Sequence, residues 1–278
     1  MGYWEYPAFI VFGLMVGTYG TLVGLGGGFV IVPVLLLVLK MGHEQAAGTS
    51  LAVVFLNAVS ASFSYIRQKR VDFKSGIKFA IATVPGAIAG PLVSTHISSA
   101  LFNLIFGILL VVASAFLMWR PEVRQSPDSD VRIALGRGRV TRRLVDTNGN
   151  IFAYTFNERV GVVISFFAGF LSSILGIGGG VVHVPAMIHL FSFPAHIATA
   201  TSQFILVITS GVGAASHLSL GDVRLDWAIA MGIGVIIGAQ YGAALSKRLQ
   251  GSLIIRLLSL ALVVTGLRLA LSGLGIWK

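Results

Sequence analysis

The chain has 278 residues, of which 55% are hydrophobic and 11% are charged, and its mean hydropathy is +0.88. Because a soluble domain carries about a quarter charged residues, this composition excludes a water-soluble domain, a disordered chain and a nucleic-acid-binding protein. The formal net charge of +10 is expected in the loops, where basic residues set the orientation of membrane helices. The absence of cysteine excludes disulfides, thiolate nucleophiles and cysteine metal sites.

Long apolar segments recur along the chain and indicate an all-α polytopic membrane protein. They cover residues 8–40, 46–66, 75–94, 99–119, 160–192, 198–219, 226–246 and 252–272. About 20 consecutive apolar residues are enough for one helix to cross the bilayer. The first residues lack the basic region of a cleaved signal peptide, so we expect the first segment to be retained.

Two of these segments, 8–40 and 160–192, are too long for one straight crossing. Each contains a glycine cluster partway along, at 24–28 and at 176–180. Glycine is unfavourable in a helix interior, and three glycines in a row strongly favour unwinding. The sequence therefore predicts a broken helix at the start of each half of the chain.

The two halves align without a gap at a shift of 152 residues, which takes Gly24 to Gly176. The same shift takes Gly26, Gly27 and Gly28 to Gly178, Gly179 and Gly180, Pro33 to Pro185, Thr49-Ser50 to Thr201-Ser202, and Gly86 and Gly90 to Gly238 and Gly242. We interpret the pattern as an internal duplication, which is how many secondary transporters are built. The predicted organisation is a first transmembrane repeat at 1–119, a basic loop at 120–159 and a second transmembrane repeat at 160–278.

Lys and Arg cluster in two loops, at 67–74 and at 120–159. The positive-inside rule assigns both loops to the cytoplasm. If each segment crosses the membrane once, both chain termini are cytoplasmic as well. If each broken segment is instead a re-entrant hairpin, the two halves are inverted relative to each other. The charge pattern leaves both topologies open, and in either case we expect a multi-pass protein of the bacterial inner membrane.

The loop at 120–159 is the one substantial polar stretch of the sequence. From Arg139 to Asn157, apolar and polar residues alternate on either side of Asn148-Gly149, the dipeptide preferred in a two-residue type I′ turn. This pattern predicts a small cytoplasmic β-hairpin. Its basic residues either contact anionic lipid headgroups or belong to an ordinary inside loop.

The glycine clusters are the strongest candidates for a binding site. A helix break exposes N–H groups at the start of the following half-helix, where the helix dipole adds positive potential, so an anion can bind without a charged side chain. Within a membrane, such groups are tolerated only in the protein interior or facing a cavity. We expect substrate-binding backbone groups at Gly26, Gly27, Gly28, Gly178, Gly179 and Gly180. Close helix packing is the alternative role for these glycines.

Polar side chains near the starts of the second and sixth apolar segments add hydrogen-bonding groups. They are Thr49 and Ser50 in the first half, Thr201, Ser202 and Gln203 in the second half, and Asn57 two turns beyond Ser50. Hydroxyl and amide groups can donate hydrogen bonds to the oxygens of an anion. Helix capping or bonding to the preceding turn is the alternative for the hydroxyls. The counterpart of Asn57 is Thr209, so the predicted site is only pseudo-symmetric.

His183 is the only ionisable side chain directly beside a glycine cluster, and Ile31 takes its place in the first half. Histidine titrates near neutrality, so His183 either changes charge during a transport cycle or stays a neutral hydrogen-bonding residue. All ten Asp and Glu residues fall in loops or at segment ends, which favours an anion over a cation as substrate. The sequence lacks metal-spaced clusters, a catalytic triad and a P-loop, so it predicts neither an enzyme nor a cofactor or metal.

The elements Gly-Leu-Gly-Gly-Gly-x4-Pro at 24–33 and Gly-Ile-Gly-Gly-Gly-x4-Pro at 176–185 resemble those of the sulfite exporter TauE/SafE-like permeases. So does the run Ala-Thr-Ala-Thr-Ser-Gln at 198–203, with its counterpart at 46–50. The resemblance covers nearly the whole chain, with 120–159 as the least typical part. It implies an integral membrane permease of duplicated four-helix units, linked to transport of sulfite, sulfonates and related sulfur-containing anions.

Together these features predict a secondary transporter, working as an exporter, that moves a small sulfur-containing oxyanion by alternating access. The expected partners are a small anionic substrate and the lipid bilayer, with no nucleic acid. Two alternatives remain open: a passive anion channel that uses the same backbone groups, and a non-transporting membrane scaffold that acts through its cytoplasmic loop. Deletion of residues 125–157 separates the scaffold from the transporter, because flux survives the deletion only in a transporter.

Overall fold

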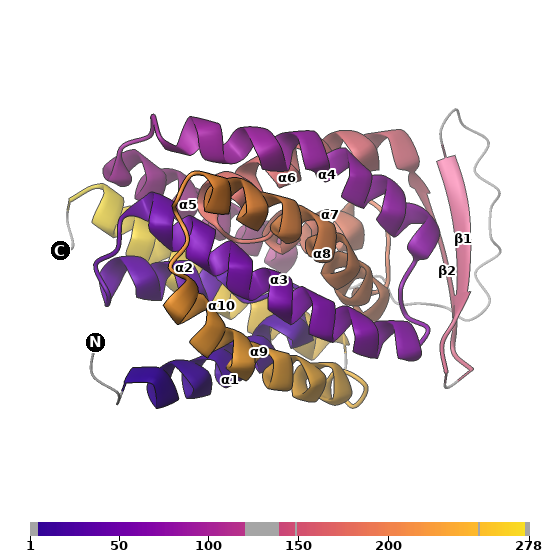
Figure 1. The fold of residues 1–278 in the computed structure, drawn as a ribbon. Coiled ribbons are helices and arrows are strands. Elements are labelled where there is room, and N and C mark those ends of the chain that lie inside the picture. The colour runs from indigo at the N-terminus through magenta and orange to yellow at the C-terminus, as the bar shows by residue number, and fades with distance from the viewer. Residues whose placement is uncertain (1–4, 120–138, 148, 250, 276–278) are drawn as a thin grey trace.

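The computed structural model describes residues 5–119, 139–147, 149–249 and 251–275, which form a helical bundle with a two-stranded sheet at one end (Figure 1). The elements in chain order are α1 (Glu5–Val23), α2 (Gly28–Leu37), α3 (His43–Arg67), α4 (Phe73–Ser94), α5 (Ser99–Trp119), β1 (Arg139–Val145), β2 (Ile151–Asn157), α6 (Glu158–Leu175), α7 (Gly180–His189), α8 (Ala195–Ser219), α9 (Leu225–Leu245) and α10 (Gly251–Gly273). The predicted helical membrane fold with a small hairpin between its halves is confirmed.

Each broken helix is a re-entrant pair. α1 runs into the bundle, and the short α2 turns back towards the end at which α1 began, while α6 and α7 do the same from the opposite end (Figure 1). As a result, α1 begins and α10 ends at the end of the bundle away from the β-hairpin (Figure 1). Of the two topologies that the charge pattern left open, the single-crossing one with both termini beside the basic loop is therefore wrong. The two halves run in opposite directions through the protein.

The two halves interlock through their first helices. The first helix of each half packs against a helix of the other half: α1 against α9, and α6 against α4. In addition, α3 packs against α8 and α5 packs against α10. Glycine allows these close approaches. A Cβ at Gly86 of α4 would lie 2.5 Å from the carbonyl oxygen of Phe166 in α6, and a Cβ at Gly238 of α9 would overlap the carbonyl oxygen of Leu14 in α1.

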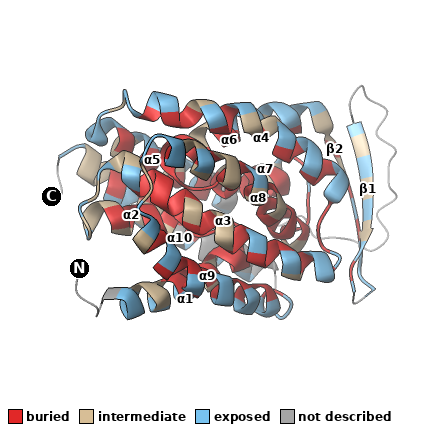
Figure 2. Ribbon diagram, viewed as in Figure 1, coloured by how far each residue is buried: buried red, intermediate tan, exposed pale blue. Residues whose placement is uncertain are grey.

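The outer faces of the bundle are apolar. Among the described residues, six helices are long and apolar enough to cross a membrane, namely α1, α3, α4, α6, α8 and α9. On α4, the exposed residues Ile77, Ile81, Ile88 and Leu92 recur at helical spacing and form one outward stripe. Figure 2 shows exposed residues on the outside of the helices and buried residues facing the middle. This distribution suits a lipid surrounding, and the protein is a multi-pass membrane protein.

The predicted β-hairpin is confirmed, but its turn is not the predicted one. The strands are separated by residues 146–150, which is longer than a two-residue connection. The N–H of Gly149 donates to the Asp146 carbonyl and the N–H of Asp146 donates to the Asn150 carbonyl, each over 3.1 Å. Gly149 has φ +82°, the left-handed conformation that closes longer hairpin loops. Asn148, the other residue of the predicted type I′ turn, lies outside the described residues.

Candidate functional site

The two predicted helix breaks are present, and glycine makes both possible. Between α1 and α2 the backbone φ angles are +83° at Gly24, +74° at Gly26 and +92° at Gly27. The corresponding glycines between α6 and α7, Gly176, Gly178 and Gly179, have φ angles of +74°, +79° and +85°. Residues with a Cβ rarely adopt this left-handed region, so the chain reverses at these positions because they are glycine.

The two breaks are in direct backbone contact in the middle of the protein. A Cβ at Gly28 would lie 2.6 Å from the carbonyl oxygen of Gly176. In the reciprocal contact, a Cβ at Gly180 would lie 2.7 Å from the carbonyl oxygen of Gly24. All residues of both glycine clusters are buried. Because Gly28 and Gly180 have no side chain, the backbones of the two breaks can pack directly against each other.

Backbone N–H groups at the starts of α2 and α7 are left without backbone partners. Val30 and Ile31 donate to the Gly27 carbonyl, and Val182 and His183 donate to the Gly179 carbonyl, which closes the first turn of each short helix. Among the described residues, no backbone hydrogen bond is donated by the N–H groups of Gly27, Gly28, Phe29, Gly179, Gly180 and Val181. Buried donors at a helix start are the feature that favours anion binding.

Ser50 and Ser202 lock each break to the opposite half. Ser50 Oγ donates to the Gly176 carbonyl over 2.7 Å, and Ser202 Oγ donates to the Gly24 carbonyl over 2.8 Å. Gln203 Nε2 adds a 3.0 Å hydrogen bond to the carbonyl of Gly20, one turn before the first break. The hydroxyl donors of both serines and one N–H of the Gln203 amide are therefore engaged with the protein in this conformation. These side chains orient the breaks, and the serine hydroxyls donate to a substrate only if their hydrogen bonds are exchanged.

Thr49 and Thr201 lie farther from the breaks and hold helix starts instead. Thr49 Oγ1 accepts a 3.0 Å hydrogen bond from the N–H of Arg224, just before α9. Thr201 Oγ1 accepts a 3.0 Å hydrogen bond from the N–H of Asp72, just before α4. These two contacts correspond under the shift of 152 residues. In this structure, both threonine hydroxyls accept from the backbone N–H that directly precedes a helix of the other half.

Asn57 lies beside the first break with one unused donor. Its Oδ1 accepts a 3.2 Å hydrogen bond from Thr21 Oγ1, in the last turn of α1. Asn57 is completely buried, and its Nδ2 has no hydrogen-bond partner among the described residues. A buried amide donor without a partner is costly unless something binds it, so Asn57 stays a candidate for contact with a substrate.

His183 is buried beside the second break between two hydrogen-bonding groups. Its Nδ1 lies 3.1 Å from the Gly179 carbonyl oxygen, and its Nε2 lies 3.1 Å from Ser165 Oγ. The hydroxyl of Ser165 also lies 2.7 Å from the Gly161 carbonyl oxygen. Because a carbonyl only accepts, Nδ1 carries a proton, and Ser165 can either donate to Nε2 or accept from it and donate to Gly161. The same heavy-atom positions therefore accommodate neutral and protonated His183.

Sequence reasoning missed a second pair of side chains that hold the breaks. Tyr65 Oη donates to the Thr21 carbonyl over 3.0 Å, and His217 Nε2 lies 2.9 Å from the Ser173 carbonyl oxygen. The shift of 152 residues relates Tyr65 to His217 and Thr21 to Ser173. Because tyrosine and histidine are different residue types, the alignment of the two halves shows no identity at this position. Their positions in the shifted alignment, rather than their residue types, were the available signal.

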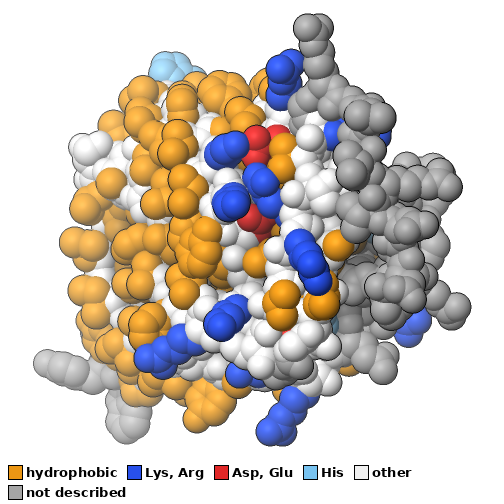
Figure 3. Space-filling view, turned by 90° about the vertical axis from the view of Figure 1, so that its right-hand side faces the viewer, with side chains coloured by type: hydrophobic (Ala, Val, Ile, Leu, Met, Phe, Trp, Pro, Cys, Tyr) orange, Lys and Arg blue, Asp and Glu red, His pale blue; other side chains and the backbone are white. Residues whose placement is uncertain are grey.

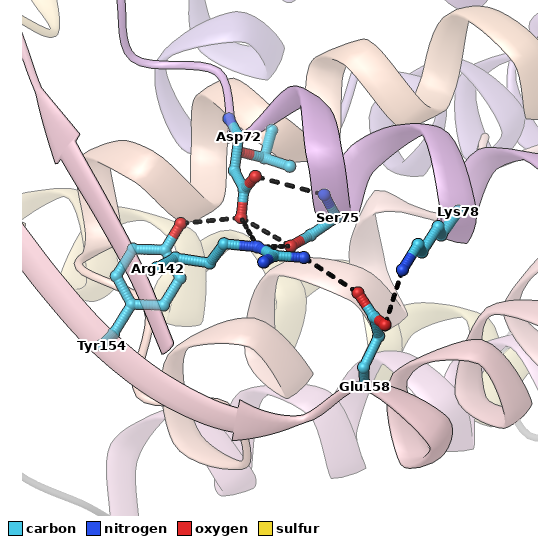
Figure 4. Close-up of polar contacts among 7 residues, drawn as sticks. Asp72, Ser75, Lys78, Arg142, Tyr154 and Glu158 are labelled. Carbon is cyan, nitrogen blue, oxygen red and sulfur yellow. Dashed lines mark hydrogen bonds and ion pairs between the residues drawn. The ribbon is translucent and has the colours of Figure 1, made fainter. Parts of the chain in front are cut away.

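A buried polar network attaches the β-hairpin to the bundle (Figure 4). Asp72, which caps the start of α4, accepts a 2.9 Å hydrogen bond from Tyr154 Oη and lies 3.7 Å from Arg142 Nε. Arg142 also forms a 3.0 Å ion pair with Glu158 at the start of α6, and Glu158 pairs with Lys78. Burial together with the neighbouring Asp72 carboxylate raises the pKa of Tyr154 far above its ordinary value, so its hydroxyl stays a donor.

Aromatic packing completes the attachment of the hairpin. The ring of Tyr154 lies 4.2 Å, centroid to centroid, from the ring of Phe193 in the α7–α8 connection. The ring of Phe156 lies 5.1 Å from the ring of Phe193. Tyr154 and Phe156, both in β2, are buried. The hairpin therefore covers the connections at one end of the bundle rather than projecting freely into solvent.

These features define a polytopic membrane permease: helices of both halves interlock, two re-entrant breaks meet in the interior, and the acidic residues that the structure describes lie towards the ends. The chain belongs to the family described as Sulfite exporter TauE/SafE, which matches residues 9–269.

Several curated relatives support this assignment. The Probable membrane transporter protein YunE of Bacillus subtilis is 36% identical over 272 residues, which cover 95% of this chain and 97% of the relative. A Probable membrane transporter protein of Methanocaldococcus jannaschii is 27% identical, with 94% of each chain covered. YjnA of Bacillus subtilis is 26% identical and covers 94% of this chain and 98% of its own. No solved structure matches the chain significantly. The protein is thus a membrane transporter of this family and not an enzyme.

Proposed function

We propose that this protein is a secondary transporter that exports a small sulfur-containing oxyanion, such as sulfite or an organosulfonate, by alternating access. The observation that carries the proposal is the contact between the two helix breaks, where buried N–H groups of α2 and α7 lack backbone partners. An oxyanion accepts hydrogen bonds on several oxygens, which suits paired helix starts. The family description, Sulfite exporter TauE/SafE, agrees with this class of substrate.

The substrate-binding groups in this proposal are the backbone of Gly26, Gly27 and Gly28 and of Gly178, Gly179 and Gly180, with Thr49, Ser50, Asn57, His183, Thr201, Ser202 and Gln203 assisting. The electrostatics around the breaks favour an anion. Within the described part of the chain, the carboxylates fall in loops or at helix ends, so none of them neutralises the positive ends of α2 and α7 from within the bundle. Asn57 supplies an additional free amide donor beside the first break.

Alternating access requires the breaks to separate and close again. In this conformation they touch, and the Ser50–Gly176 and Ser202–Gly24 hydrogen bonds connect the two halves. Since the halves run in opposite directions, movement of one half against the other opens a path from one end and closes it from the other. The serine hydroxyls then move from the carbonyls of the opposite break to the oxygens of the substrate.

His183 is the proposed site of proton coupling. Uptake of a proton at Nε2 turns this nitrogen from acceptor to donor, and the hydroxyl of Ser165 rotates from Nε2 to the Gly161 carbonyl. No heavy atom has to move in this exchange of hydrogen bonds. Release of the proton reverses the rotation.

We assign the hairpin end to the cytoplasmic side of a bacterial inner membrane. Figure 3 looks onto this end and shows Lys and Arg side chains gathered there. The segments at this end carry Arg67 at the end of α3, Lys69 after it, Lys74 in the first turn of α4, and Lys247 and Arg248 after α9. Basic residues are retained on the cytoplasmic side of membrane proteins, which supports this orientation.

Counterflow in proteoliposomes tests the proposed function. Vesicles preloaded with sulfite or an alkyl sulfonate should show saturable, trans-stimulated uptake of the labelled anion. Gly27→Val and Gly179→Val should abolish this uptake while the protein still inserts, because both glycines have positive φ at the breaks. Gly221→Val is the matched control, since Gly221 has φ +81° but no atom within 4 Å of an added Cβ.

The same assay separates the alternatives. Unchanged flux in both Gly27→Val and Gly179→Val contradicts the role of the breaks. Flux that neither saturates nor shows trans-stimulation identifies a passive anion channel. Flux that survives deletion of residues 125–157 identifies a transporter, whereas a protein that shows no flux and loses its biological function on this deletion is a scaffold that acts through its loop.

A further inference from the structure

A pocket of about 350 Å³ lies at the hairpin end of the bundle, away from the helix breaks. Its lining comes from the last turn of α3 and the connection after it, the end of α9 and the connection after it, and the hairpin loop. The lining residues are Ser64, Arg67, Gln68, Thr147, Ala244 and Lys247. None of the break glycines contributes to it, so this pocket is separate from the proposed transport site.

The two cations of the pocket are not neutralised by the protein. Within the described part of the chain, neither Arg67 nor Lys247 forms an ion pair with a carboxylate. Arg70 in the same connection shows the contrast, because it lies 3.7 Å from Asp146. The guanidinium of Arg67 stands 4.0 Å over the ring of Phe63, a cation–π contact that leaves its N–H groups free for a ligand.

Gln68, which lines the pocket, carries a buried acceptor without a partner in the part of the chain that the structure describes. The residue is 4% exposed, and its Nε2 donates a 3.0 Å hydrogen bond to the Ala243 carbonyl, which determines the orientation of the amide. Its Oε1 is buried and accepts no hydrogen bond among the described residues. A buried acceptor without a partner is costly, and it prefers a ligand that brings an N–H or O–H group.

The pocket lies where the apolar belt of the protein meets its basic end. On α3, Phe63 lies one turn before Arg67 and is 55% exposed. Ile66 directly precedes Arg67 and is 39% exposed. A surface with exposed apolar residues followed directly by cations is the arrangement found at the headgroup level of a membrane. The pocket is therefore reachable both from the lipid headgroups and from the aqueous phase.

We propose that the pocket lined by Arg67, Gln68 and Lys247 binds an oxyanion head of the phosphate or sulfonate type that carries a hydrogen-bond donor, as an ethanolamine phosphate does. Arg67 and Lys247 hold the anionic oxygens. Gln68 Oε1 accepts from the ammonium or hydroxyl group of the same ligand. Phosphatidylethanolamine in the bilayer and a free ethanolamine-type anion in the cytoplasm share this chemistry.

The test uses the purified full-length protein in an uncharged detergent, with the thermal unfolding midpoint as the readout. O-phosphoethanolamine should raise the midpoint, whereas phosphocholine, which has the same phosphate but no N–H, should raise it much less. Lys247→Gln should weaken O-phosphoethanolamine binding about tenfold or more, the effect of losing one charge-assisted hydrogen bond. Arg248→Gln is the matched control, because the adjacent Arg248 does not line the pocket.

A second measurement identifies the source of the ligand. Protein reconstituted in bilayers of phosphatidylcholine and phosphatidylethanolamine is released into detergent, and the retained lipid is measured by native mass spectrometry. Retention of phosphatidylethanolamine by the wild type, with its loss in Lys247→Gln, supports the lipid source. A thermal shift with O-phosphoethanolamine but no retained lipid supports the soluble source.

The proposal is overturned if Lys247→Gln and Arg248→Gln behave alike in both measurements. Equal stabilisation by phosphocholine and O-phosphoethanolamine contradicts the role of Gln68. Neither measurement depends on transport, so a negative result here leaves the proposed transport function untouched. Equally, an inactive Gly27→Val protein should still bind the probe, because Gly27 does not line this pocket.

Discussion

The two helix breaks have the same backbone arrangement but different side-chain chemistry. Ser50 and Ser202 make reciprocal hydrogen bonds to the opposite break, of 2.7 Å and 2.8 Å. In the first turn of the short helix, the second break has the ionisable His183, whereas Ile31 occupies the corresponding position of the first. The shared serine contacts and the unshared histidine therefore point to two different roles. The features common to both breaks hold the junction between the halves, and the feature present at one break alone can hold a proton.

The breaks also differ in the space around the glycine that directly precedes the short helix. A Cβ at Gly27 would lie 2.5 Å from Val16 Cγ1 in α1, whereas a Cβ at Gly179 would lie no closer than 3.4 Å, from His183 Nδ1. At this position the first break is therefore packed more tightly than the second. We expect Gly179 to have more room for a small side chain than Gly27 has.

The largest effect is expected where the two breaks touch. Gly28→Ala and Gly180→Ala each place a Cβ against the backbone of the opposite break, at 2.6 Å and 2.7 Å from a carbonyl oxygen. Each should lower the free energy of unfolding by about 3 kcal/mol, because backbone cannot give way as a side chain can. Counterflow should fall to background. Gly42→Ala is the control, as an added Cβ there meets no atom within 4 Å.

These two variants also test the reciprocity of the junction. If Gly28→Ala is severe and Gly180→Ala is as stable as the wild type in detergent unfolding, the contact between the breaks is not symmetric in solution.

A smaller and equal effect is expected from the two serines. Ser50→Ala and Ser202→Ala each leave a buried carbonyl of the opposite break without its donor, which should cost about 1–3 kcal/mol of unfolding free energy. Denaturant unfolding in detergent measures the loss. Ser219→Ala serves as the control because Ser219 is exposed. A loss confined to one of the two serines would contradict the idea that both breaks are held in the same way.

His183→Ile gives the second break the side chain of the first. We expect this variant to keep counterflow but to lose accumulation driven by a pH gradient, which for one coupled proton is about tenfold per pH unit. Measurement of substrate accumulation in vesicles with an imposed pH gradient checks this. Ser165→Ala should weaken the coupling as well, since it removes the hydroxyl that adapts to both protonation states. Accumulation that is unaffected in His183→Ile rules out this histidine as the proton carrier.

The smallest effect is expected at the end of the bundle away from the hairpin. Arg224 and Asp226 form a 2.9 Å ion pair with side chains 45% and 36% exposed, so Arg224→Gln should change the unfolding free energy by less than about 1 kcal/mol. At the hairpin end, Arg142 pairs with Asp72 and Glu158 in a largely buried network, and Arg142→Gln should cost more. Equal losses in detergent unfolding would show that the hairpin is not anchored by this network.

Much of the local structure could be predicted from the sequence. The glycine clusters marked the helix breaks because no other residue adopts the left-handed backbone at such low cost. Alternation from Arg139 to Asn157 marked the hairpin, since strand side chains alternate between faces. The type of the turn was missed, because Asn-Gly suits several loop lengths and the pairing of Asp146 with Asn150 selects one of them.

The candidate site was predictable as a set of positions but not as a set of contacts. The shift of 152 residues identified Ser50 and Ser202 as a pair, yet each bonds to the break of the other half, which no local pattern reveals. Thr49 and Thr201 looked equivalent to their serine neighbours, but one position along a helix turns a side chain by about 100° and directs it to another helix.

Apolar periodicity, glycine clusters and the scarcity of charge by themselves determined that this chain forms broken membrane helices, because these properties act within a few residues of each other. Whether the chain passes through a break or turns back depended on which helices pack against α1 and α6, and these come from the opposite half. The tertiary structure decided that the breaks turn back and meet, and it alone formed the pocket of Arg67 and Lys247 from segments distant in sequence. Burial and hydrogen bonding between such segments are properties of the folded chain.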